Sequence, residues 1–149
     1  MSLPLEVALK QCERHAVVMG HAMREIPQPL TVESLQQPQS ELLRLVDQFV
    51  FRFTKLQDTM GTHVLRQFAT KVLAEPVEDA PFIEVLQLLE RHGFLTVDAW
   101  ARQRSVRNAL THEYPEDPLR QVLALTDAQR LAHQLSDWVA QMQSRLNQS

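Results

Sequence analysis

The sequence predicts an all-α fold, an antiparallel bundle of about five helices. Apolar residues recur every three or four positions through several long segments, which is the spacing of helices that pack through one face. Prolines and glycines lie at the ends of most of these segments. No stretch of useful length alternates apolar and polar residues as a strand would. A chain of 149 residues fits a single domain, residues 1–149, which can bury roughly 70% of its unfolded surface.

The first predicted helix covers residues 5–26 and ends at Pro27 and Pro29. A polar connection over residues 27–38 follows it. The apolar positions of this helix follow one another at alternating spacings of four and three residues: Leu5, Leu9, Cys12, Ala16, Met19, Met23 and Ile26. Cys12 is the only cysteine, so no internal disulfide exists, and its place in this series predicts a core residue rather than a reactive thiol.

The second helix is long, with Ser40 as its expected N-cap. It is apolar over more than one stripe, so we expect it at the centre of the bundle. Gly61 either interrupts this helix or lies within a longer one that reaches Pro76. Arg52 and Lys55 flank Phe53, and Arg52 is expected to be a solvent-side or interface charge rather than a catalytic group. The apolar positions are Leu42, Leu45, Phe49, Phe53, Leu56 and Met60, flanked by Val46, Val50 and Phe51.

Three further helices complete the prediction. The third begins near Pro81 and ends at Gly93, a residue suited to a C-terminal cap. The fourth begins after Thr96 and is expected to stop at Pro115 and Pro118. The fifth is expected to open at the capping box Thr126-Asp127-Ala128-Gln129, with apolar positions at Ala128, Leu131, Leu135, Trp138, Met142 and Leu146.

Composition and charge narrow the classes of function. The net charge of −3 argues against broad, non-specific coating of nucleic acid and leaves room for a local basic site. No apolar run approaches the roughly 20 residues of a membrane span, and the chain opens with no signal peptide, so the expectation is a cytoplasmic protein without a membrane partner. The sequence predicts no cofactor and no metal site, because His15, His21 and His63 have no second ligand three or four residues away.

The segment Arg107-Asn108-Ala109-Leu110-Thr111-His112-Glu113-Tyr114 is the richest in chemistry. Within eight residues it offers a cation, hydrogen-bonding side chains, an acid–base group and a phenol. A metal-independent ribonuclease needs little more, because the 2′-hydroxyl of RNA attacks its own phosphate while a histidine moves the protons and a cation stabilises the phosphate charge. On an ideal helix Arg107 and His112 differ by about 140° and do not share a face. Asn108 and His112 are i, i+4 neighbours, so Asn108 can orient the imidazole.

This segment resembles the R-x4-H-x-Y motif of HEPN domains, most closely the HepT-like toxins and the related nucleotidyltransferase substrate-binding proteins. The resemblance implies a small all-α bundle, usually a homodimer, that acts as the toxin of a toxin–antitoxin pair. It implies a ribonuclease site in which Arg107 and His112 are catalytic, with Asn108 on the polar position after the arginine. It also implies a minimal nucleotidyltransferase antitoxin as partner, which silences the toxin by attaching AMP to Tyr114.

Basic residues near the motif add to this interpretation. Arg102 and Arg104 precede it on the same predicted helix, and they are expected to help bind an RNA backbone. The alternative for these residues is a solvated helix face. For the whole chain, the alternative is a non-catalytic binding or substrate-presenting subunit of a nucleotidyltransferase, and a third possibility is a bundle with neither role. Trp100 and Trp138 are expected as core or interface anchors more than as base-stacking groups.

Overall fold

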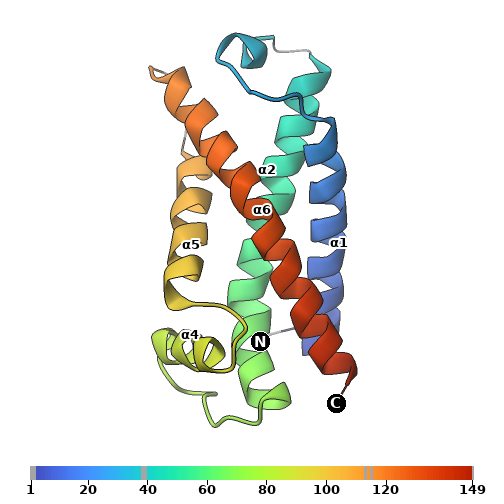
Figure 1. The fold of residues 1–149 in the computed structure, drawn as a ribbon, viewed down its shortest axis with the longest axis vertical. Helices are drawn as coiled ribbons and strands as arrows, with labels where there is room; N and C mark the ends of the chain where they lie inside the picture. Colours follow the sequence, from blue (N-terminus) through green and yellow to red (C-terminus); the bar gives the residue numbers. More distant parts are fainter. Residues whose placement is uncertain (1–2, 38–39, 113, 115, 149) are drawn as a thin grey trace.

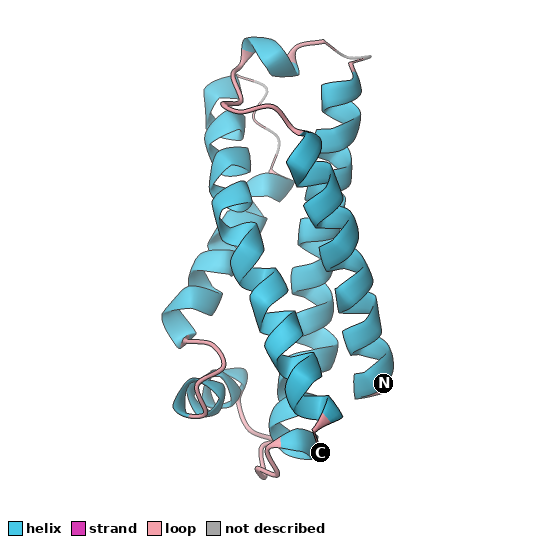
Figure 2. Cartoon of the chain, turned by 45° about the vertical axis from the view of Figure 1, so that its right-hand side comes forward, coloured by secondary structure: helices cyan, strands magenta, loops and turns pink. Residues whose placement is uncertain are grey.

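The computed structural model of the chain describes residues 3–37, 40–112, 114 and 116–148, and within these residues it contains helices and loops with no strand. The predicted all-α class is therefore confirmed. Five main helical segments form an elongated bundle, with both chain ends near the same end of it (Figure 1). The longest helix, α6, crosses the other helices diagonally, and a 45° turn of the bundle shows the same packing from the side (Figure 2).

Helices α1 (Leu5–Glu25) and α2 (Glu41–Thr59) form an antiparallel pair, as predicted. The Ser40 hydroxyl accepts a hydrogen bond from the backbone N–H of Leu43 at 3.2 Å, so Ser40 is the N-cap of α2. The connection between them contains one short helical turn, η1 (Glu33–Leu35), and its predicted end at Pro38 lies outside the described residues. Helix α2 contacts α1, α5 and α6, which confirms its predicted central position.

The second helix does not stop at Gly61. It continues through the wide turns of η2 (Met60–Val64), the short α3 (Leu65–Gln67) and the wide turns of η3 (Phe68–Val72). A side chain at Gly61 would meet the Trp100 ring, because a Cβ built there lies 3.3 Å from Cζ2 of that ring. Gly61 therefore favours the close approach of Trp100, and it does not end the helix.

Helices α4 (Phe82–Arg91) and α5 (Val97–Thr111) begin at the predicted signals, and α4 also ends at its predicted cap. Gly93 follows α4 with a φ of 80°, a left-handed conformation that glycine adopts without strain. The Thr96 hydroxyl accepts a hydrogen bond from the N–H of Ala99 at 3.0 Å and caps α5.

Helix α6 (Pro118–Asn147) starts earlier than predicted. Its N-cap is Asp117, and Pro118 occupies the first turn, where a missing N–H has no cost. The Thr126 hydroxyl instead donates to the carbonyl of Val122 at 2.9 Å inside the helix, so the predicted capping box is wrong. The prediction that Pro118 stops the preceding helix is also wrong, because α5 has already ended at Thr111; Pro115 lies outside the described residues.

The core contains the residues expected from the helical spacing. The two tryptophans are 5% exposed with ring centroids 6.3 Å apart, which makes Trp100 and Trp138 packing residues. Cys12 is fully buried, and this burial raises the pKa of its thiol to about 12, so the predicted core role is confirmed. Across the described ranges, the helices are all too short or too polar to cross a membrane.

Candidate functional site

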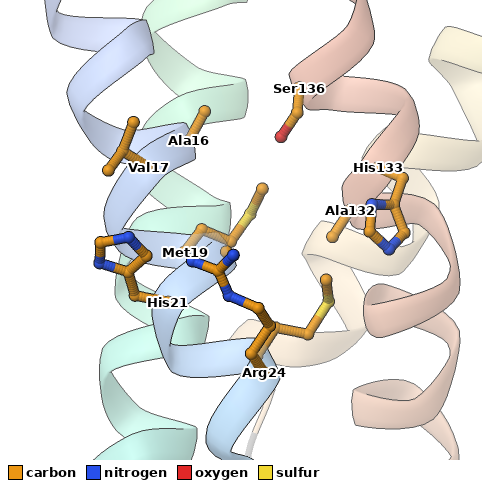
Figure 3. Close-up of a pocket in the computed structure, with 10 residues that line it drawn as sticks. Ala16, Val17, Met19, His21, Arg24, Ala132, His133 and Ser136 are labelled. Atoms are coloured by element: carbon orange, nitrogen blue, oxygen red, sulfur yellow. The ribbon is translucent and has the colours of Figure 1, made fainter.

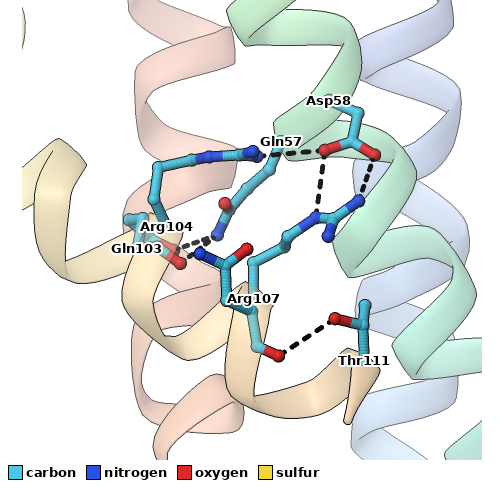
Figure 4. Close-up of polar contacts among 7 residues, drawn as sticks. Gln57, Asp58, Gln103, Arg104, Arg107 and Thr111 are labelled. Atoms are coloured by element: carbon cyan, nitrogen blue, oxygen red, sulfur yellow. Dashed lines mark hydrogen bonds and ion pairs between the residues drawn. The ribbon is translucent and has the colours of Figure 1, made fainter.

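Helix α5 carries most of the predicted site and is fixed to its neighbours by buried amides. Gln57 on α2 donates from Nε2 to the carbonyl oxygen of Gln103 at 2.8 Å and to its Oε1 at 3.1 Å (Figure 4). Gln103 Nε2 donates in turn to the carbonyl of Leu131 and to Oε1 of Gln134 on α6, both at 3.0 Å. Gln57 and Gln103 are fully buried. Because unpaired buried amides are costly, this network sets the position of α5 against α2 and α6.

One turn further along α5, two arginines share one carboxylate on α2. Arg107 binds Asp58 with both branches of its guanidinium, Nε to Oδ1 at 3.1 Å and Nη2 to Oδ2 at 2.7 Å. Arg104 adds a third hydrogen bond, Nη1 to Oδ1 at 3.0 Å. Figure 4 shows the carboxylate between the two guanidinium groups. The paired geometry is the strong form of this interaction, so the Arg107 side chain has a defined direction towards α2.

Asp58 remains charged under ordinary conditions. Its partial burial acts to raise its pKa, but the hydrogen bonds and charges of Arg107 and Arg104 outweigh this and hold the pKa below the usual 3.8. Two guanidinium charges against one carboxylate leave the cluster with one net positive charge. Asp58 was not among the residues predicted for the site. The sequence offered one signal for it. Asp58 is an acidic residue next to Gln57, on a helix whose apolar residues cover more than one face.

His112 lies where α5 ends. Its backbone is extended, with φ −84° and ψ 143°, and its side chain is exposed. Asn108 is also exposed, and its carbonyl accepts a hydrogen bond from the Thr111 hydroxyl at 2.9 Å. Both Asn108 and His112 are described residues, and no hydrogen bond joins their side chains. The expected i, i+4 relation is lost because the helix stops one residue before His112.

The His112 side chain lines a groove of about 430 Å³ between three helices. Asp47, Val50 and Phe51 of α2 form one wall, and Gln121 of α6 is on the other side. Arg107 is not among the groove's lining residues. The structure thus brings Arg107 together with Arg104 and Asp58, and it brings His112 together with the groove, without joining the two predicted catalytic residues in one chain.

Tyr114 is half-buried and packs back against the end of α5. Its hydroxyl donates to the carbonyl of Ala109 at 3.1 Å, and the Arg120 guanidinium lies 5.2 Å from the centre of its ring. The ring centroids of Tyr114 and His112 are 6.4 Å apart. Pro115 lies outside the described residues, and the Tyr114 phenol points towards the protein.

The two arginines predicted to bind RNA differ in their surroundings. Arg104 is held by Asp58, with 38% of its side chain exposed. Arg102 is exposed and has no ion pair within the described part of the chain. Among the described residues, Arg102 is therefore the arginine of α5 that has no carboxylate partner.

A second hollow lies between α1 and α6, away from the motif. It has a volume of about 270 Å³, and Figure 3 shows Ala132, His133 and Ser136 of α6 facing Met19 and Arg24 of α1 across it. In the residues that the structure describes, no three histidine, cysteine, aspartate or glutamate side chains gather closely enough to hold a metal ion.

Comparison with protein-family models, with curated proteins and with solved structures finds no match to this chain. The resemblance to HEPN domains therefore depends on the motif residues, and the site has to be argued from its own geometry.

Proposed function

We propose that the protein is a metal-independent endoribonuclease of the HEPN type, acting as the toxin of a toxin–antitoxin pair. The observation that carries this proposal is His112, an exposed imidazole on the wall of a groove. It lies five residues after Arg107, which together with Arg104 and Asp58 forms a cluster with a net positive charge. This combination supplies an accessible acid–base group and a fixed cation on one helix, which are the two requirements for cleavage by the 2′-hydroxyl.

In the proposed reaction the 2′-oxygen of a ribose attacks the adjacent phosphorus, and the bond from phosphorus to the 5′-oxygen breaks. His112 takes the proton of the 2′-hydroxyl, and the resulting imidazolium gives it to the departing 5′-oxygen. The products are a 2′,3′-cyclic phosphate and a 5′-hydroxyl. Arg107 stabilises the phosphate charge in the transition state, and Asn108 contacts the substrate or the imidazole once RNA is bound.

The pairing of Arg107 with Asp58 is compatible with this role. An arginine has five N–H donors, and Arg107 uses Nε and one hydrogen of Nη2 on Asp58. Three donors remain for a phosphate oxygen. Asp58 then acts as a positioning residue that aims the guanidinium, and a homodimer would bring the Arg107 of one copy to the His112 of the other.

The partner in this proposal is a nucleotidyltransferase that attaches AMP to Tyr114. The phenol oxygen attacks the α-phosphate of ATP, loses its proton to the partner and releases pyrophosphate. The hydrogen bond from Tyr114 to the carbonyl of Ala109 must first break, because the hydroxyl donates its only proton there. The added phosphate then lies close to His112, whose ring is 6.4 Å from that of Tyr114, and blocks the groove by bulk and charge.

The second candidate is a non-catalytic subunit that binds or presents a substrate to a nucleotidyltransferase. The separation of Arg107 from the groove favours this candidate, because a paired arginine and an isolated histidine do not form an active site within one chain. Both candidates retain Tyr114 and the nucleotidyltransferase partner.

Cleavage of RNA by the purified protein in the presence of a chelator distinguishes the two candidates. We expect His112→Ala to slow cleavage on the order of 10²- to 10⁴-fold and Arg107→Ala to have a comparable effect. His133→Ala, which removes another exposed histidine outside the motif, is the matched control and should cleave like the wild type. Intact RNA with folded, AMP-free wild-type protein would refute the ribonuclease and favour the binding subunit.

A further inference from the structure

A group of basic side chains lies on the surface shared by α1 and α2, outside the motif. We call Arg14, His15, Arg52 and Lys55 the α1–α2 basic cluster. Arg52 Nη1 lies 3.1 Å from Nδ1 of His15, and because arginine can only donate, that nitrogen accepts. Burial first, and then the charges of Arg52, Lys55 and Arg14, lower the pKa of His15. Arg52 contacts His15 directly, Arg52 and Lys55 both lie over the Phe51 ring, and the charge of Arg14 also acts on His15, so the four groups share one surface.

Among the residues that the structure describes, none gives the cluster a carboxylate partner. The ion pairs formed by the described residues leave out Arg14, Arg52 and Lys55. In addition, Nε of Arg52 is buried and makes no hydrogen bond within that part of the chain. Two arginines and a lysine therefore share one surface without compensation, in a chain whose net charge is −3. Such a surface is complementary to an anion with several charges.

An exposed aromatic ring lies at the edge of the cluster. Phe51 is 51% exposed, and the Arg52 guanidinium and the Lys55 ammonium lie 5.5 Å and 5.8 Å from the centre of its ring. Phe51 is also one of the residues that line the groove containing His112. The ring thus connects the cluster to the candidate active site over one turn of α2.

Cations beside an exposed aromatic ring are the combination by which proteins bind single-stranded nucleic acid, with phosphates on the cations and a base stacked on the ring. We propose that single-stranded RNA binds along the outer face of α2, with a base on Phe51 and phosphates on Arg52 and Lys55, and that this surface leads the strand into the His112 groove. This inference rests on the proposed ribonuclease for its choice of RNA. The carboxylate of Asp47 on the groove wall repels phosphates. The strand therefore enters the groove with a base or ribose facing that wall.

Binding of a labelled RNA that cannot be cleaved tests this surface independently of catalysis. The probe is a single-stranded oligouridylate with 2′-O-methyl riboses, measured by fluorescence anisotropy at several salt concentrations. Arg52→Gln with Lys55→Gln should weaken binding on the order of 10-fold and reduce the slope of log K against log salt by about 1.4, at 0.7 for each phosphate contact. Phe51→Ala should weaken it on the order of 5- to 100-fold while leaving the salt slope unchanged.

Arg44→Gln is the matched control, because Arg44 is an exposed arginine on the same helix that is paired with Glu41. It should bind RNA as tightly as the wild type, and urea unfolding should confirm that every variant is folded. The inference is overturned if the Arg52/Lys55 and Phe51 variants bind like the wild type, if Arg44→Gln loses as much affinity as they do, or if an RNA duplex or polyglutamate competes as well as the single strand.

The outcomes separate this inference from the proposed function. If the wild type cleaves RNA and the cluster variants bind and cleave like it, the ribonuclease is supported and the α1–α2 surface is rejected. If the wild type cleaves nothing, yet binds the probe through Phe51, Arg52 and Lys55, the surface is supported and the ribonuclease is rejected.

Discussion

Helix α2 carries two groups of basic neighbours on different faces, and they differ in how their charge is balanced. Towards α5, Arg104 and Arg107 both bind the carboxylate of Asp58. Towards α1, Arg52 contacts the neutral form of His15 and has no carboxylate among the described residues. Arg104 and Arg107 are thus ordered and partly neutralised, whereas Arg52 and Lys55 have no counter-charge among the described residues. The first arrangement suits precise positioning of a group, and the second suits attraction of a flexible polyanion.

Removal of the balancing carboxylate should have the largest effect on stability. Asp58→Ala leaves two guanidinium groups side by side without a counter-charge, and we expect a loss of about 2 kcal/mol in the free energy of unfolding, after allowing for their partial exposure. Arg52→Ala removes one hydrogen bond to a neutral histidine and should cost less than about 1 kcal/mol. Urea unfolding of both variants measures the difference, and equal losses would contradict the asymmetry between the two faces.

Acid should lower the stability of the fold by protonating Asp58, which binds the arginines of α5. Its folded pKa is below the unfolded value of 3.8, so the folded state binds fewer protons than the unfolded state as the pH falls past that value. The stabilisation is complete above the unfolded pKa and disappears as the pH falls through the folded pKa. Unfolding between pH 5 and pH 2 should show this loss in the wild type and not in Asp58→Asn. An unchanged acid limb in the variant would show that Asp58 is not its source.

Protonation of His15, on the α1 side of α2, should lower the stability of the fold at a higher pH than protonation of Asp58 does, and by less. The pKa of His15 is lowered from 6.5, so protonation favours the unfolded state, and stability falls as the pH drops from the unfolded pKa of His15 through its folded pKa. His15→Gln keeps an acceptor for Arg52 and should flatten this part of the profile. The comparison uses thermal unfolding at closely spaced pH values, and a steeper profile in the variant would reverse the assigned sign.

Arg102→Ala should have the smallest effect on stability. Arg102 lies exposed on α5 and has no ion pair within the described ranges, so its removal should change the free energy of unfolding by less than about 0.5 kcal/mol. The same variant also tests whether Arg102 contributes to RNA binding as predicted. A loss of stability comparable to that of Asp58→Ala would mean that α5 is held by exposed charges as much as by its buried contacts.

The helices were predictable from local signals, and the exception shows the limit of those signals. Ser40, Thr96 and Gly93 act where the sequence suggested, because a cap involves residues within a few positions. Thr126 begins an equally good capping pattern, yet it lies inside α6. A capping pattern does not exclude a helix that begins earlier, and the helical spacing of Leu119, Val122 and Leu125 just upstream was the signal for that earlier start.

The site was predictable only in part, because its decisive contacts join residues distant in sequence. The bond between Arg107 and Asp58 spans 49 positions, and the amide network from Gln57 to Gln103 spans 46. The spacing of the motif predicted that Arg107 and His112 do not share a helix face; in the structure Arg107 binds Asp58 on α2, and His112 lies beyond the end of α5. The spacing carried no information about the carboxylate that Arg107 would meet on α2.

The single tyrosine and the two tryptophans give the protein two separate intrinsic probes. Tyr114 lies against the last turn of α5, so its ring resonances in NMR report events at the end of that helix. Trp100 and Trp138 pack together in the core, and their fluorescence reports the state of the whole bundle. Local release of the motif and global unfolding can therefore be followed in one sample without any label. A ligand that perturbs the tyrosine signal while the tryptophan emission stays constant acts at the α5 end alone.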